Sequence, residues 1–132
     1  MLRYRGRVSG ALLDRIDIRV EMPRVPDACL GAAPPASVED SARVRTRVAE
    51  ARARQHARTG GPNQRLSQQE LDRHCALRSH DADLLASAAA RMHLSARSRH
   101  RILRVARTIA DLDGSEPLRT EHLCEAIQLR TL

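Results

Sequence analysis

The chain contains no lysine, no tryptophan and no phenylalanine, and Tyr4 is its single aromatic residue. Without lysine it has no G-x-x-x-x-G-K-[ST] loop, in which the lysine reaches the phosphates of ATP. With a single aromatic ring it lacks the stacking platform on which single-stranded nucleic acids bind. A core of Leu, Ile, Val and Ala is typical of a helical bundle, whereas sandwiches and barrels usually contain aromatic residues. The sequence therefore predicts an all-α fold that does not hydrolyse ATP by itself.

Cysteines are few, and their spacing is not that of a disulfide framework or a metal site. Cys29, Cys75 and Cys124 are odd in number and widely spaced, without a C-x-x-C pair. This pattern fits a reducing cytosol and argues against a disulfide framework. The pairs His74-Cys75 and His122-x-Cys124 invite a zinc interpretation, but structural zinc sites show two close ligand pairs at recognisable spacings. We expect free thiols and no metal site.

Long apolar runs are also missing. No stretch is long enough to span a bilayer, and the first five residues are not followed by the apolar region of a signal peptide. The expected location is cytoplasmic, with no membrane partner.

Positive charge is abundant. The formal net charge is +7, and all 23 Lys/Arg positions are arginine. A GC-rich coding bias accounts for the choice of arginine over lysine. The sign of the charge nevertheless favours anionic partners such as a nucleotide, a nucleic acid or an acidic protein surface.

The first 36 residues differ from the rest of the chain. Ile16, Ile18 and Val20 alternate with charged residues, a strand pattern that ends at Pro23. A strand needs a sheet, and no clear second strand follows. The segment either joins a sheet supplied from elsewhere or is disordered in isolation, and we expect the latter. Residues 26–36 contain three prolines and a glycine, which exclude helix and mark a domain boundary. We predict a flexible arm with a remnant strand over 1–36 and a helical domain over 37–132.

Helix start and stop signals divide residues 37–132 into four or five helices. Ser37 with an acid three residues later predicts a helix that runs to about Thr59. Ser67 and Glu70 form a reciprocal capping box, from which a short helix should run to about Cys75. The remaining predictions are a helix from near Asp81, a helix capped by Ser95 and ended by Asp113-Gly114, and a last helix capped by Thr120.

Three arginines form a stripe on the helix that follows Ser95. Arg97, Arg101 and Arg104 stand at i, i+4 and i+7, which places them on one side of a helix. Guanidinium groups suit phosphate because their donors form a rigid fork and stay charged. Charge alone leaves two interpretations open: a solvated basic edge paired with Asp111 or glutamates, or a phosphate contact.

Longer segments carry a family resemblance. Residues 9–18, SGALLDRIDI, are similar to the pattern S-G-P-L-L-D-R-I-D, with Ala11 in place of the proline. Residues 93–112, HLSARSRHRILRVARTIADL, are similar to L-S-A-R-x-x-x-R-I-L-R-V-A-R-T-I-A-D-L, and residues 64–75 are similar to an N-x-x-L-x-x-x-x-L-x-x-x-C run. Together they resemble the C-terminal lid region of Mg-chelatase-like AAA+ ATPases of the ComM/YifB type.

The resemblance implies roles for single residues. Arg15 corresponds to the arginine finger, which is supplied to a neighbouring subunit and stabilises charge on the transferring phosphoryl group. One arginine of the Ser95 helix corresponds to the second sensor, which contacts the γ-phosphate in the same subunit. Arg104 fits this role when magnesium-chelatase lids guide the alignment, and Arg97 fits when replicative helicases do; Arg101 is the third candidate.

The implied function is that of a non-catalytic lid. It would close over ATP and Mg²⁺ held by a separate AAA+ core, within a hexameric ring that acts on DNA, and would bind no cofactor in isolation. The isolated chain is expected to be a monomer. The alternatives are a stand-alone basic helical module that binds DNA or an acidic protein, and a chain that complements a separate ATPase in trans.

Overall fold

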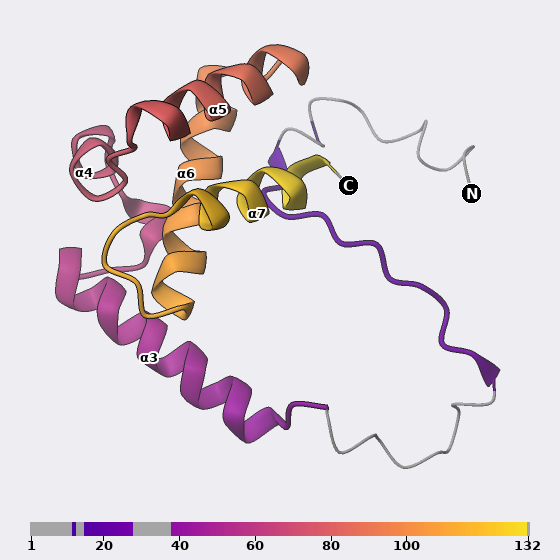
Figure 1. Cartoon of the computed structure of the whole chain (residues 1–132). Coiled ribbons are helices and arrows are strands. Elements are labelled where there is room, and N and C mark those ends of the chain that lie inside the picture. Colours follow the sequence, from indigo (N-terminus) through magenta and orange to yellow (C-terminus); the bar gives the residue numbers. More distant parts are fainter. Residues whose placement is uncertain (1–11, 13–14, 28–37, 132) are drawn as a thin grey trace.

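The computed structural model describes residues 12, 15–27 and 38–131. The described part contains five α helices, one short 3₁₀ helix and no strand (Figure 1). The elements are α3 (Ser41–Thr59), η2 (Asn63–Arg65), α4 (Gln68–His74), α5 (Ser79–Arg91), α6 (Ala96–Leu112) and α7 (Thr120–Thr131). The prediction of an all-α fold is confirmed.

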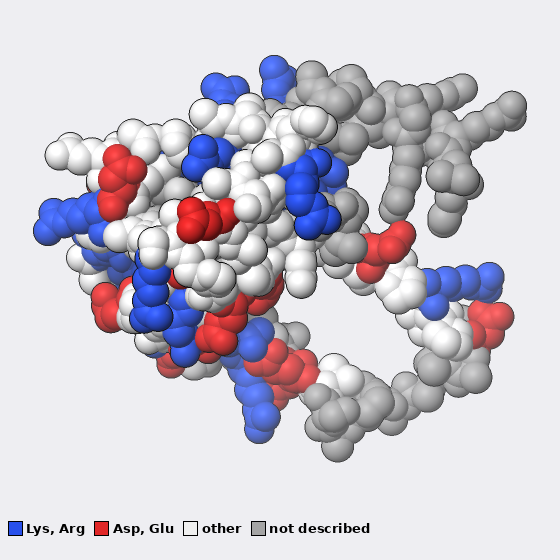
Figure 2. Space-filling view, turned by 45° about the horizontal axis from the view of Figure 1, so that its top comes forward, with Lys and Arg blue, Asp and Glu red and all other residues white. Residues whose placement is uncertain are grey.

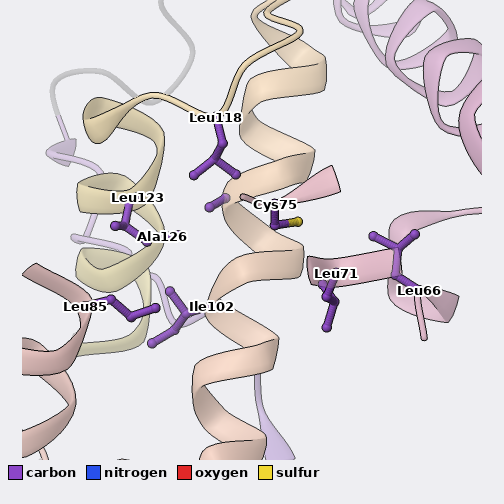
Figure 3. Close-up of a cluster of buried hydrophobic side chains, with 9 residues drawn as sticks. Leu66, Leu71, Cys75, Leu85, Ile102, Leu118, Leu123 and Ala126 are labelled. Atoms are coloured by element: carbon purple, nitrogen blue, oxygen red, sulfur yellow. The ribbon is translucent and has the colours of Figure 1, made fainter. Parts of the chain in front are cut away.

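Helix α6 is the centre of the arrangement. It packs against α3, η2, α4 and α7, and α5 packs against α7. Figure 3 shows Leu85, Ile102 and Leu123 gathered where α5, α6 and α7 meet, while Leu66 and Leu71 lie on the other side of α6. These residues belong to one buried cluster without an aromatic side chain. Removal of this apolar surface from water is the main force that holds the helices on α6.

Several local signals act as predicted. Ser67 accepts from the backbone N–H of Glu70 while Glu70 accepts from that of Ser67, so the capping box is formed. Ser95 caps α6, and its side chain accepts from the backbone N–H of Ser98. Gly60 and Gly114 have φ angles of 73° and 71°, the left-handed conformation that ends α3 and follows α6.

Other helix starts differ from the prediction. Helix α3 begins at Ser41, because the carboxylate of Asp40 accepts from the backbone N–H of Arg43 at 2.7 Å and caps the helix there. The expected cap Ser37 lies outside the described residues. Thr120 is the first residue of α7, and its hydroxyl donates to the buried Asp81 at 2.6 Å. The threonine hydroxyl therefore makes a tertiary contact with Asp81 instead of capping the helix.

Residues 16–20, which carry the strand pattern, form no strand, because no described segment offers them a partner strand. The segment instead lies against the end of α7. The backbone N–H of Arg19 donates to the carbonyl of Leu129 at 2.7 Å, and Arg130 donates to the carbonyl of Ile16 at 2.8 Å. Beyond it, residues 20–27 run away from the helices (Figure 1), and Met22 is 83% exposed.

A buried ionic cluster joins α3, η2 and α6. The carboxylate of Asp111 is fully buried and pairs with Arg58 of α3 and with Arg107 one turn earlier on α6. It also accepts from the side-chain amide of Asn63 at 2.7 Å. Arg107 in turn donates to the carbonyls of Ser115 and Glu116 in the loop before α7. Asp111 therefore serves the fold, and the interpretation that it pairs with the Arg97–Arg101–Arg104 stripe is wrong.

Candidate functional site

A pocket of about 600 Å³ opens where α6 meets η2, α7 and the N-terminal segment. Its lining combines charged side chains with an apolar wall. The lining residues are Asp17, Ile18, Gln64, Arg65, Arg101, Arg104, Val105, Thr108, Ile109, Leu112, Glu125 and Leu129. Three arginines and two acidic residues therefore line one cavity.

The side chain of Arg104 is fixed by a hydrogen bond to the backbone. It is half-buried, and one of its terminal nitrogens donates to the carbonyl of Leu66 at 2.7 Å. Its Nε is buried and has no hydrogen-bond partner within the described ranges. The carbonyl bond fixes the direction of the side chain, and a guanidinium held in one direction suits an oxygen-rich anion.

Arg101 lies one turn earlier on α6 and contacts the N-terminal segment. Its guanidinium lies 3.3 Å from the carboxylate of Asp17, and the two side chains are 22% and 50% exposed. Exposed ion pairs of this kind contribute about 0–1 kcal/mol, because water and salt screen them. The pair is therefore weak enough for another anion to replace it.

The other two candidates lie apart from this cavity. Arg97 is exposed in the first turn of α6 and does not line the pocket. Arg15 is exposed on the N-terminal segment, two residues before Asp17. The structure thus brings together Arg101 and Arg104, adds Arg65, and leaves Arg97 and Arg15 open to a partner.

Cys75 has the character of a core residue. Its side chain is buried with the apolar cluster, and burial raises the pKa of its thiol to about 11. A thiol with so high a pKa is protonated at neutral pH and is a poor nucleophile or metal ligand.

Among the described residues, one group of potential metal ligands converges, and it contains neither Cys75 nor Cys124. It consists of Asp113, Glu121 and His122. Arg119 pairs with both carboxylates, and its backbone N–H donates to Nδ1 of His122 at 3.1 Å. Arg119 bridges the two carboxylates, which explains the convergence without an ion.

The surface charge is mixed rather than segregated. On the face shown in Figure 2, arginines and acidic residues are interspersed over the helices instead of forming one broad basic field. Several arginines of α3 have local partners, since Arg47 pairs with Glu39 and Arg54 with Glu50. Within the described ranges, no helix is both long and apolar enough to cross a membrane.

A family model for the C-terminal part of magnesium chelatase subunit ChlI matches residues 38–130. The match begins just before α3 and ends within α7, so it covers all the helices that build the pocket. The chain belongs to the magnesium chelatase ChlI C-terminal family. This membership confirms the resemblance to Mg-chelatase-like proteins.

Curated relatives match nearly the whole chain. The competence protein ComM of Haemophilus influenzae is 40% identical over 132 residues, which are 100% of this chain and 26% of the relative. The uncharacterised protein YifB of Escherichia coli is 40% identical over 131 residues, 99% of this chain and 26% of the relative. An uncharacterised protein of Mycobacterium tuberculosis is 39% identical over 132 residues. The chain spans about a quarter of the length of the curated relatives it matches.

Sequence reasoning missed two parts of this site. The Asp17–Arg101 pair joins residues 84 positions apart, and no local sequence pattern predicts such a contact. Arg130 is 4% exposed and connects Ile16 to Ser98, to whose hydroxyl it donates at 3.0 Å. An arginine near the end of a helix is usually solvated. In the local sequence, only the neighbouring Leu129 indicated that Arg130 is buried.

Proposed function

We propose that this chain is the helical lid of a Mg-chelatase-like AAA+ ATPase and contacts the phosphates of ATP that a separate core binds. The proposal is supported above all by Arg101 and Arg104, which line one pocket in a chain of the magnesium chelatase C-terminal family. Neither residue lies in the apolar cluster of the fold, so their placement at a cavity suits a ligand contact.

Arg104 is the better candidate for the second sensor. Its hydrogen bond to Leu66 pre-organises the guanidinium, so less side-chain entropy is lost when an anion binds. Arg97 is exposed, and no described residue accepts a hydrogen bond from its guanidinium. In this proposal Arg104 stabilises negative charge on the γ-phosphate, and Mg²⁺ and ATP are held by residues of the core.

Arg15 would serve the neighbouring subunit. It is exposed on the segment that docks beside α7, which leaves its guanidinium accessible to a second chain. An arginine supplied in trans stabilises the charge of the phosphoryl-transfer transition state. We further propose that the ring acts on DNA; the relative in Haemophilus influenzae is named a competence protein.

A chimera tests the proposal. The matching quarter of the Haemophilus influenzae relative is replaced by this chain, and ATP turnover is compared with that of the relative truncated before the match. We expect the chimera to hydrolyse ATP faster than the truncated form, and Arg104→Ala to lower turnover more than Arg97→Ala. A folded, assembled chimera with no gain over the truncated form would refute the lid function.

The rival function, a stand-alone DNA-binding module, has less support. On the face shown in Figure 2, the interspersed charges do not form the continuous basic surface that tracks a phosphate backbone. Duplex DNA titrated with the isolated chain at several salt concentrations separates the two, because counterion release gives phosphate binding a steep salt dependence.

A further inference from the structure

The carboxylate of Asp17 occupies a place at Arg101 that a phosphate would also favour. The two side chains are 3.3 Å apart, and both line the pocket that contains Arg104. A carboxylate and a phosphate oxygen are alternative acceptors for the same guanidinium donors.

The backbone on both sides of Asp17 is anchored. Arg130 donates to the carbonyl of Ile16, and the N–H of Arg19 donates to the carbonyl of Leu129. The side chain of Asp17 is therefore presented to α6 by fixed neighbours rather than by a loose chain. Arg130 is itself buried and bound to Ser98, so the anchor is part of the helical body.

We propose that Asp17 is an internal competitor, which holds Arg101 until a phosphate-bearing ligand enters the pocket and displaces it. The inference rests on the proposed function, because it assumes that the Arg101–Arg104 pocket receives a phosphate group. Asp17 follows Arg15 by two residues, so its displacement from Arg101 removes one of the contacts that hold the segment with the proposed finger against the helices. Phosphate binding in one subunit is thereby linked to the arginine offered to the next.

Phosphate binding and docking of the N-terminal segment are linked through a difference in affinity. A ligand shifts an equilibrium only by the difference in its affinity for the two states. With the segment docked, Asp17 competes for the donors of Arg101, and with the segment released, this competition ends and Arg101 can turn to an anion beside Arg104. Phosphate binding therefore favours the released segment, and a docked segment weakens phosphate binding to the same extent.

Inorganic pyrophosphate is a suitable probe on the isolated 132-residue chain at low salt, with affinity measured by calorimetry. We expect Asp17→Asn to tighten binding by about two- to fivefold, the range set by an exposed ion pair. Glu125→Gln is the matched control, since Glu125 lines the same pocket and makes no ion pair with an arginine of the described ranges. It should change affinity less than Asp17→Asn does.

Amide hydrogen exchange supplies the structural readout in the unmodified chain. Pyrophosphate should speed exchange of the Arg19 amide, which is bonded to Leu129, and leave the Leu71 amide within α4 unchanged. The inference is overturned if Asp17→Asn leaves affinity unchanged or weaker, if Glu125→Gln tightens it equally, or if pyrophosphate binds neither form. None of these readouts uses ATP turnover, so failure of the chimera would refute the lid function separately.

Discussion

Replacement of Asp111 by alanine is expected to destabilise the helical body by about 3–5 kcal/mol. The carboxylate is fully buried and pairs with Arg58 and Arg107. Its removal leaves two guanidinium groups without their counter-charge, one of them in Arg107, which is 2% exposed. A loss of this size is a large fraction of the stability of a small domain.

The measurement is urea unfolding followed by circular dichroism at 222 nm. Asp111→Asn should cost less than Asp111→Ala, because the amide oxygen still accepts a hydrogen bond while the charge is lost. Asp72→Ala is the control: this exposed carboxylate only accepts from Gln68, and its loss should stay within about 0.5 kcal/mol. Equal, small losses for Asp111→Ala and Asp72→Ala would show that the buried cluster does not hold the fold.

Replacement of Arg15 by alanine is expected to lower ATP turnover of the chimeric assembly by about 10³-fold or more, the magnitude that arginine fingers contribute. The expected loss lies in turnover rather than in folding, because Arg15 is exposed. The measurement is steady-state ATP hydrolysis at saturating ATP. Arg24→Ala is the control in the same segment, since it removes an exposed arginine paired only locally with Asp27.

Mixed assemblies determine whether the arginine acts in trans. Arg15→Ala subunits are combined with subunits that carry a defective phosphate-binding loop in their core. If Arg15 serves the neighbour, an Arg15→Ala subunit next to an intact finger keeps its own nucleotide competent, and mixing restores part of the turnover. Mixtures no more active than either parent, with mixing verified, would place Arg15 outside the proposed role.

The sequence predicted what depends on neighbours along the chain. The capping box of Ser67 and Glu70 and the cap at Ser95 each involve residues three positions apart, and the structure has both. The near-absence of aromatic residues favoured a helical bundle, and the described residues form five helices. The start of α3 was misplaced because two caps compete within four residues, and the carboxylate of Asp40 caps the described helix.

The sequence could not predict the contacts between residues that lie far apart along the chain. Asp111 meets Arg58 across 53 positions and Asp17 meets Arg101 across 84, and neither pairing leaves a periodic signal. In a chain with 23 arginines, charge alone cannot select which arginine each acid will meet. The stripe on α6 was visible as spacing, but its division into pocket residues and the exposed Arg97 required the positions of η2 and α7.

The central claim is that the residues that bind the triphosphate belong to a core outside these 132 residues. Mg·ATP binding to the isolated chain tests this claim most directly. Calorimetry at physiological salt, with and without Mg²⁺, is the measurement. We predict at most weak binding that Mg²⁺ does not strengthen and that added salt abolishes, as for a few arginines without a phosphate loop. Tight, magnesium-dependent capture of ATP by this chain alone would contradict the account.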